Sequence, residues 1–238
     1  MHLRNTLSCF CLLVLLASCS EREFAERPEY RVKKRILVDA SHDGGVWWFP
    51  QSGSFDPNVN HQGTAIANYL RTLGQEVDEL PSNAPVTDSL LSLYTGVIRA
   101  GNYGAYSSET LTAYDNFLSK GGSLFLIGEY LITGAQDQLA EDLGIQFSGS
   151  HYGHVDSFAV NPVTTGGTSY YYNAGSVVKN TRSNADIEIL GWLDHDATKP
   201  VLGILHHPKA KIFFTGDING LETVPQPLSA RIYEWLYR

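Results

Sequence analysis

The fold is decided by VIRAGNYGAYSSETLTAYDNFLSKGGSLFLIGEY, residues 97–130. Residues 96–100 read as a short apolar strand, and a helical pattern then runs to Gly121-Gly122, where a helix stop belongs. Residues 123–127 form a second apolar run. Strands that are joined by an amphipathic helix make a right-handed βαβ unit, in which the two strands are parallel. The stretch therefore predicts a parallel sheet that is covered by helices.

The same alternation continues on both sides of this stretch. Residues 35–39 and 76–80 read as strands with a helix between them, and residues 201–205 and 211–215 read as a hairpin before a last helix. Residues 151–184 are rich in Gly, Ser, Thr, Asn and Tyr, which favours an insertion of loops and short strands. The sequence predicts an α/β fold with a doubly wound, mainly parallel sheet of the flavodoxin or amidotransferase type, a C-terminal hairpin and a loop-rich insertion.

The first residues have the layout of an export signal. An apolar run follows Arg4 and is shorter than the roughly 20 residues that span a bilayer. It ends in Leu16-Ala17-Ser18-Cys19, which resembles the bacterial lipobox. The alternatives are an ordinary signal peptide and a cytosolic protein with an apolar start. The resemblance implies that the chain is cut before Cys19 and anchored to a membrane by lipid on this cysteine. Ser20 stands where an inner-membrane retention signal usually has Asp, which favours the outer membrane.

The expected organisation follows from this signal. Residues 1–18 are the lipoprotein signal peptide, and residues 19–34 are the lipidated cysteine and a charged tether. Residues 35–238 form a single domain, long enough for one sizeable core. The localisation expected is therefore the bacterial cell envelope, with a lipid anchor.

Composition excludes several classes of function. The chain has 17 basic and 25 acidic residues, a net charge of −8, which argues against nucleic acid as a partner. No cysteine follows Cys19, so the domain has no disulfide, zinc thiolate or thiol nucleophile. Gly44-Gly45 and Gly166-Gly167 fit neither GxGxxG nor the P-loop pattern. We therefore expect neither a nucleotide nor a cofactor.

Several segments together resemble a known family. RILVDASHDGG (35–45), the stretch 97–130, KIFFTGDING (211–220) and ARIYEWL (230–236) are similar to class I glutamine-amidotransferase-like domains. The similarity is greatest to the bacterial branch related to the GIFT domain of intraflagellar transport proteins. True amidotransferases place a nucleophilic cysteine on the turn after a strand, and Glu129 occupies that position here. A carboxylate cannot replace the thiolate, because the acyl-enzyme would be an anhydride. The resemblance therefore implies the fold and not the activity.

Polar residues follow several of the predicted strands. Ligands of open parallel sheets bind beyond the carboxyl ends of the strands, so we expect these side chains to converge at one edge. A single Asp after a strand is commonly a turn residue, and the cluster is therefore more informative than its members. The candidates are Asp39, Ser41, His42 and Asp43 after the first strand, Asn102 and Tyr103 after the third, Glu129 after the fourth, and Asp217 after the last.

Three chemistries fit such a cluster. The first is ligand binding, in which Trp47 and Trp48 offer aromatic faces to a sugar, although the same pair could instead pack in the core. The second is a metal site, but the Asp and His residues match no ligand signature. The third is acid/base hydrolysis by Glu129 with Asp39 or Asp217, whose separation would decide the stereochemistry. A Ser-His-Asp arrangement with Ser41 lacks the GxSxG pattern.

The sequence thus predicts a membrane-anchored envelope lipoprotein whose amidotransferase-like domain is not catalytic. The domain binds a small polar ligand such as a glycan, or a partner protein. The binding residues expected are Asp39, His42, Asp43, Trp47, Trp48, Asn102, Tyr103, Glu129 and Asp217. The alternative is a hydrolase of saccharides or related envelope material, with or without the assistance of a metal, with Glu129, Asp39 and His42 as its catalytic candidates. A third class is a purely structural component of the envelope.

Overall fold

The apolar runs that flank residues 97–130 form parallel strands. β1 (Arg35–Asp39), β3 (Gly96–Ala100), β4 (Ser123–Ile127) and β9 (Lys211–Thr215) lie side by side, with β2 (Glu76–Leu80) outside β1, and all pairings among them are parallel. β4 is buried at every position, as expected for a strand that is covered on both faces. The computed structural model describes residues 34–42, 64–81, 83–100, 105–129, 136–183, 185–217, 219 and 227–238.

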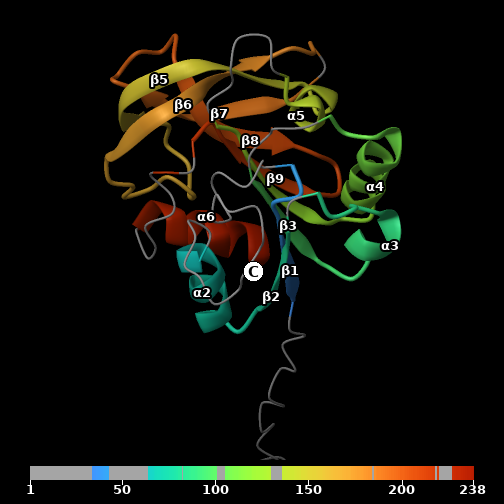
Figure 1. Cartoon of the computed structure of the whole chain (residues 1–238). Coiled ribbons are helices and arrows are strands. Elements are labelled where there is room, and N and C mark those ends of the chain that lie inside the picture. Colours follow the sequence, from blue (N-terminus) through green and yellow to red (C-terminus); the bar gives the residue numbers. More distant parts are fainter. Residues whose placement is uncertain are drawn as a thin grey trace, which may run out of the picture. The chain divides into compact units, whose positions relative to one another are not determined.

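Helices cover both faces of these parallel strands (Figure 1). α2 (Thr64–Thr72) and α6 (Pro227–Tyr237) pack on one face, which we call the α6 side. α3 (Asp88–Leu91), α4 (Ser108–Ser119) and α5 (Gln138–Asp142) pack on the other, which we call the α4 side. Ser107 caps α4, because its side chain accepts a hydrogen bond from the backbone N–H of Thr110. Each face has its own hydrophobic core.

The second half of the chain extends the sheet with antiparallel strands. These are β5 (Ile145–Phe158), β6 (Tyr170–Asn180), β7 (Ile187–Leu193) and β8 (Pro200–His206), and the strand order is β2-β1-β3-β4-β9-β8-β7-β5-β6. In the described part of the chain, four strand pairings are parallel and four are antiparallel. The prediction of a doubly wound, mainly parallel sheet is therefore wrong. The sheet is mixed, and the expected hairpin between β8 and β9 is part of it.

The error lies in the segment that the sequence suggested is a loop-rich insertion. Residues 151–184 contain the second half of β5 and the whole of β6. Their alternation is hidden because β5 changes register near Ser148 and His151 and contributes to different cores along its length. Phe147 packs on the α4 side, whereas Val155 packs on the α6 side. A strand that changes its buried face in this way has no continuous period of two.

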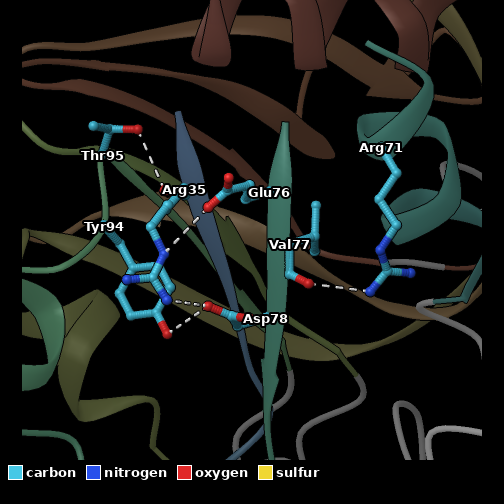
Figure 2. A network of polar contacts seen from close by, with 7 residues as sticks. All are labelled: Arg35, Arg71, Glu76, Val77, Asp78, Tyr94 and Thr95. Carbon is cyan, nitrogen blue, oxygen red and sulfur yellow. Dashed lines mark hydrogen bonds and ion pairs between the residues drawn. The ribbon is translucent and has the colours of Figure 1, made fainter. Parts of the chain in front are cut away.

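A polar network ties the outer strands together at the surface (Figure 2). Arg35 of β1 donates to Asp78 of β2 at 2.7 Å, and the hydroxyl of Tyr94 donates to the same carboxylate oxygen at 3.0 Å. The Arg35 guanidinium also lies over the Tyr94 ring, 5.0 Å from its centroid. These side chains are half exposed, so solvent screens each contact and its contribution to stability is small. The network fixes the β1–β2 edge and not a ligand site.

The described helices and strands belong to one compact unit, Lys33–Arg238. None of the helices within the described ranges has the length and apolar character needed to cross a membrane. The predicted signal peptide, the lipidated Cys19 and most of the charged tether lie outside the described residues.

Candidate functional site

The described candidate residues all lie at the carboxyl edge of the parallel strands, but on two faces. Asp39 is the last residue of β1, His42 follows this strand, and both belong to the α4 side. Glu129 and Asp217 follow β4 and β9 and belong to the α6 side. The sheet therefore separates two polar clusters that the sequence suggested would converge. The remaining candidates lie outside the described residues: Asp43, Trp47, Trp48, Asn102 and Tyr103.

Asp39 is held inside the protein by donors from its own turn and from α4. Its side chain is 1% exposed. One carboxylate oxygen accepts the backbone N–H of Ser41 at 2.8 Å, and the other accepts the hydroxyl of Tyr114 at 2.5 Å. Burial and the Asp39 charge raise the pKa of Tyr114 well above its ordinary value, so the phenol keeps the proton that it donates. Asp39 thus acts as an internal acceptor.

His42 lies beside this carboxylate and is partly exposed. Its ring stacks on Tyr106 with 3.9 Å between the centroids and 6° between the planes. Its Nδ1 lies 2.8 Å from the Oγ of Ser41. Burial lowers the pKa of His42, and the nearby Arg99 acts in the same direction, although Asp39 opposes both. The imidazole is therefore neutral near pH 7, and stacking on the buried Tyr106 ring fixes the orientation of the partly exposed His42 at the carboxyl end of β1.

A buried ion pair supports this surface from below. Arg99 of β3 aligns with Asp39 in the sheet register and forms an ion pair with Asp137. Asp137 is also the N-cap of α5, since its other oxygen accepts the backbone N–H of Ala140 at 3.1 Å. Burial alone would lower the pKa of Arg99, but the Asp137 carboxylate raises it. Arg99 therefore stays charged, and its ion pair with Asp137 fixes α5 to the edge of the sheet.

The second cluster pairs two carboxyl groups across neighbouring strands. Ile127 of β4 aligns with Thr215 of β9, and Glu129 and Asp217 lie two residues further along their strands. Residues two apart on a strand share a face, so the side chains of Glu129 and Asp217 meet, and they are hydrogen-bonded to each other. They are 1% and 0% exposed. A hydrogen bond between two carboxyl groups needs a proton, because ionised carboxylates only accept. The pair therefore shares a proton.

The environment of Asp217 sets when this proton leaves. Its two oxygens accept the backbone N–H groups of Asn173 at 2.7 Å and of Asn219 at 2.8 Å. Burial raises the pKa of Asp217 to about 6. The two backbone donors and the hydrogen bond from Glu129 lower this pKa, but by less. Burial thus outweighs the hydrogen bonds.

β6 packs across the ends of β4 and β9 and covers the carboxyl pair. Ser176 donates its hydroxyl to the Glu129 carbonyl at 2.8 Å, and its backbone N–H bonds to the Gly216 carbonyl at 2.9 Å. The approach is close, because a Cβ atom at Gly216 would collide with the carbonyl oxygen of Ser176. Tyr172 donates to the same carbonyl at 2.5 Å. The pair is therefore enclosed by the antiparallel half of the sheet.

These positions limit the chemistry that the carboxylates can perform. Asp39 and Glu129 lie on opposite faces, so they cannot flank one glycosidic bond. Glu129 and Asp217 are in direct contact, whereas glycosidases keep their carboxyl groups about 5–9.5 Å apart. Across the described ranges, no three His, Cys, Asp or Glu side chains are grouped so that they could hold a metal ion. The described geometry favours internal support over acid/base chemistry.

The residues that sequence reasoning did not select are the internal partners. Tyr114, Arg99, Asp137 and Ser176 hold the candidate residues in place. The role of Arg99 could have been predicted from the sequence, because a charge within the apolar run of 96–100 requires a buried partner. Nothing in the sequence identifies Asp137 as that partner, since the two residues are 38 positions apart.

Comparisons with known proteins show which solved structures have a similar fold. Neither the protein-family models nor the curated proteins give a match to the chain. The N-terminal domain of mmIFT52 is similar with a TM-score of 0.61 and 15% identity, over 85% of this chain and 96% of that chain. A ThuA-like protein from Parabacteroides merdae has a TM-score of 0.53 and 13% identity, over 86% of this chain and 90% of that chain.

A cold-adapted β-galactosidase from Rahnella sp. R3 is also similar, with a TM-score of 0.56 and 15% identity. The similarity covers 87% of this chain but 32% of that enzyme, so it concerns one part of a larger protein. Identities of 15% or less show architecture alone. The chain therefore has an architecture similar to that of ThuA-like proteins, whose fold is glutamine-amidotransferase-like.

Proposed function

We propose that the chain is a lipid-anchored envelope protein whose amidotransferase-like domain binds a small polar ligand without converting it. The observation that carries this proposal is the state of the carboxylates at the carboxyl edge. Asp39, Glu129 and Asp217 are almost completely buried, and each is hydrogen-bonded inside the protein. A catalytic carboxylate must reach its substrate with an oxygen that is free to exchange a proton. These three instead hold the edge in shape.

The ligand surface is on the α4 side, where His42 stacks on Tyr106. His42 is partly exposed and is neutral at pH 7. A neutral imidazole both accepts and donates hydrogen bonds, and its stacked face resists rotation. Sugars combine hydroxyl edges with apolar C–H faces and suit such a surface. Trp47 and Trp48 follow His42 closely in the chain, and we propose that they complete the surface.

The experiment is a calorimetric titration of the full chain in detergent with a panel of neutral and acidic oligosaccharides. We expect at least one saccharide to bind, and His42→Ala to weaken its binding about tenfold or more. His206→Ala is the matched control, because His206 is a half-exposed histidine aligned with Lys211 at the start of β9, the opposite edge of the parallel strands. Equal losses in the two variants, or no binding by any saccharide, would contradict the proposal.

The anchor is tested separately. When the chain is made in a bacterial host that is fed labelled palmitate, we expect label on the chain and none on Cys19→Ser. Label that persists in Cys19→Ser, or a chain that never takes up label, would contradict the lipid anchor. The ligand proposal does not depend on this result.

A further inference from the structure

Arg231 differs from every other described arginine in its surroundings. Arg35, Arg71, Arg99, Arg182 and Arg238 each form an ion pair with a carboxylate. Arg231 has no carboxylate partner among the described residues, although the chain contains 25 acidic residues against 17 basic ones. Its Nη1 atom is buried and has no hydrogen-bond partner in the described part of the chain.

The site around Arg231 is formed by α6 and by the connection between β5 and β6. Arg231 lies in the second turn of α6, and its guanidinium lies against Gly166. A Cβ atom at Gly166 would lie 3.2 Å from Nη2 and 3.3 Å from Nη1, and the backbone there has a φ of +68°. Gly167 packs on Leu228 in the first turn of the same helix. Gly166 therefore leaves room for the guanidinium of Arg231.

Burying a guanidinium nitrogen without a partner lowers stability. A cationic nitrogen that is removed from water destabilises the fold unless an anion or another acceptor replaces the water. A side chain with such a cost persists where a function needs it, as binding sites commonly reduce stability. The Arg231 side chain is only partly buried, so a ligand can reach it from the solvent side.

We propose that Arg231 is the anion-binding residue of a second site, on the α6 side, which takes a ligand that carries a carboxylate or a phosphate group. Guanidinium matches both groups, because its parallel N–H donors fit two oxygens of one anion. This site goes beyond the proposed function, because Arg231 belongs to α6 whereas His42 and Tyr106 lie on the opposite face of the sheet. An acidic saccharide would supply a carboxylate, and a phosphorylated ligand would supply a phosphate.

The test compares Arg231→Met with Arg238→Met in the full chain in detergent. Arg238 lies just after α6, is exposed and forms an ion pair with Glu234, so it is a matched control for the loss of one positive charge. The probes are inorganic phosphate, D-glucuronate and, as the neutral probe, D-glucose. Two quantities are measured, the dissociation constant of each probe and the midpoint of thermal unfolding without any probe.

We expect phosphate or glucuronate to bind the parent and Arg238→Met alike, and to bind Arg231→Met about tenfold or more weakly. Binding of phosphate alone would identify a phosphate ligand, and binding of glucuronate alone a carboxylate ligand. We also expect Arg231→Met to unfold at a higher temperature than the parent, because methionine removes the unpaired buried nitrogen while it keeps the apolar packing.

Two results would overturn the inference. One is a parent that binds neither anion. The other is an Arg231→Met variant that unfolds at a lower temperature than the parent and binds anions equally well, since Arg231 would then be a structural residue. Anion binding that is weakened in His42→Ala but unaffected in Arg231→Met would reject Arg231 as the anion-binding residue and leave the proposed function standing. A parent that binds neither the anions nor any oligosaccharide would reject both.

Discussion

Replacement of Asp217 by Asn removes a group whose ionisation is coupled to folding. The pKa of Asp217 is raised from 3.8 to about 6 by burial. A carboxyl group with a raised pKa contributes stability that is complete below its unfolded value of 3.8 and is lost as the pH rises through about 6. At about 1.4 kcal/mol per pKa unit, this interval corresponds to about 3 kcal/mol. Asp217 is fully buried, so solvent does not screen the effect.

The Asp217→Asn variant would behave differently at the two ends of this range. The single carbonyl oxygen of the new amide can accept only one of the two backbone N–H groups that Asp217 now accepts, from Asn173 and Asn219. The other N–H would face the side-chain amide, which is itself a donor, at a cost of about 1–3 kcal/mol. Below pH 4 the variant is therefore less stable than the parent by about this amount. Above pH 7 the parent has lost its advantage, so the difference falls to about zero or reverses.

Urea denaturation of both proteins between about pH 4 and about pH 8 measures this difference. Burial lowers the pKa of His42, so its contribution to stability has the opposite sign and is lost as the pH falls below 6.5. Comparing the two proteins at each pH cancels the contribution of His42. Parallel curves for parent and Asp217→Asn would refute the raised pKa. A difference that grows above pH 6 would show that Asp217 is stabilised as an anion.

Three further substitutions test the supports of the candidate site. Tyr114→Phe removes a donor from the buried Asp39 carboxylate, and we expect a loss of about 1–3 kcal/mol in urea denaturation, with a loss below about 0.5 kcal/mol counting against the contact. Asp137→Ala removes the carboxylate that pairs with the buried Arg99, and we expect the free energy of unfolding to fall by about 3–5 kcal/mol. Asp142→Ala breaks an exposed ion pair on the same helix, and we expect a fall of less than about 1 kcal/mol. Equal losses in the two variants would show that the buried pair does not support α5. Ser176→Ala should speed hydrogen exchange in β6 more than in β3, and unchanged exchange in β6 would show that the bond to the Glu129 carbonyl does not hold this strand.

The parallel half of the fold could be predicted because its signals are local. β3, α4 and β4 follow one another with a clear change of period, a serine cap and a glycine stop, so residues 97–130 specify a βαβ unit without help from the rest of the chain. The antiparallel half could not be predicted in the same way. β5 pairs with both β6 and β7 and contains register shifts, and these long-range pairings leave no period in the sequence.

The candidate site could also be predicted only in part. Polar residues at the strand ends could be read from the sequence, and Asp39, Glu129 and Asp217 do lie at one edge. The face on which each side chain lies depends on register. Asp39 is the last residue of β1, whereas Glu129 lies two residues beyond β4, and a difference of one residue exchanges the two faces. A single sequence does not state this register, so the separation into two clusters could not be predicted.

We propose that this domain binds a polar ligand and leaves it unchanged. The most direct test takes a saccharide that the calorimetric titration identifies, incubates it with excess parent protein and with Glu129→Gln, and examines the saccharide by mass spectrometry. We expect the saccharide to be recovered intact from both, and the two proteins to bind it with affinities that agree within about twofold. A product that forms with the parent and is lost with Glu129→Gln would contradict the claim and make the domain a hydrolase.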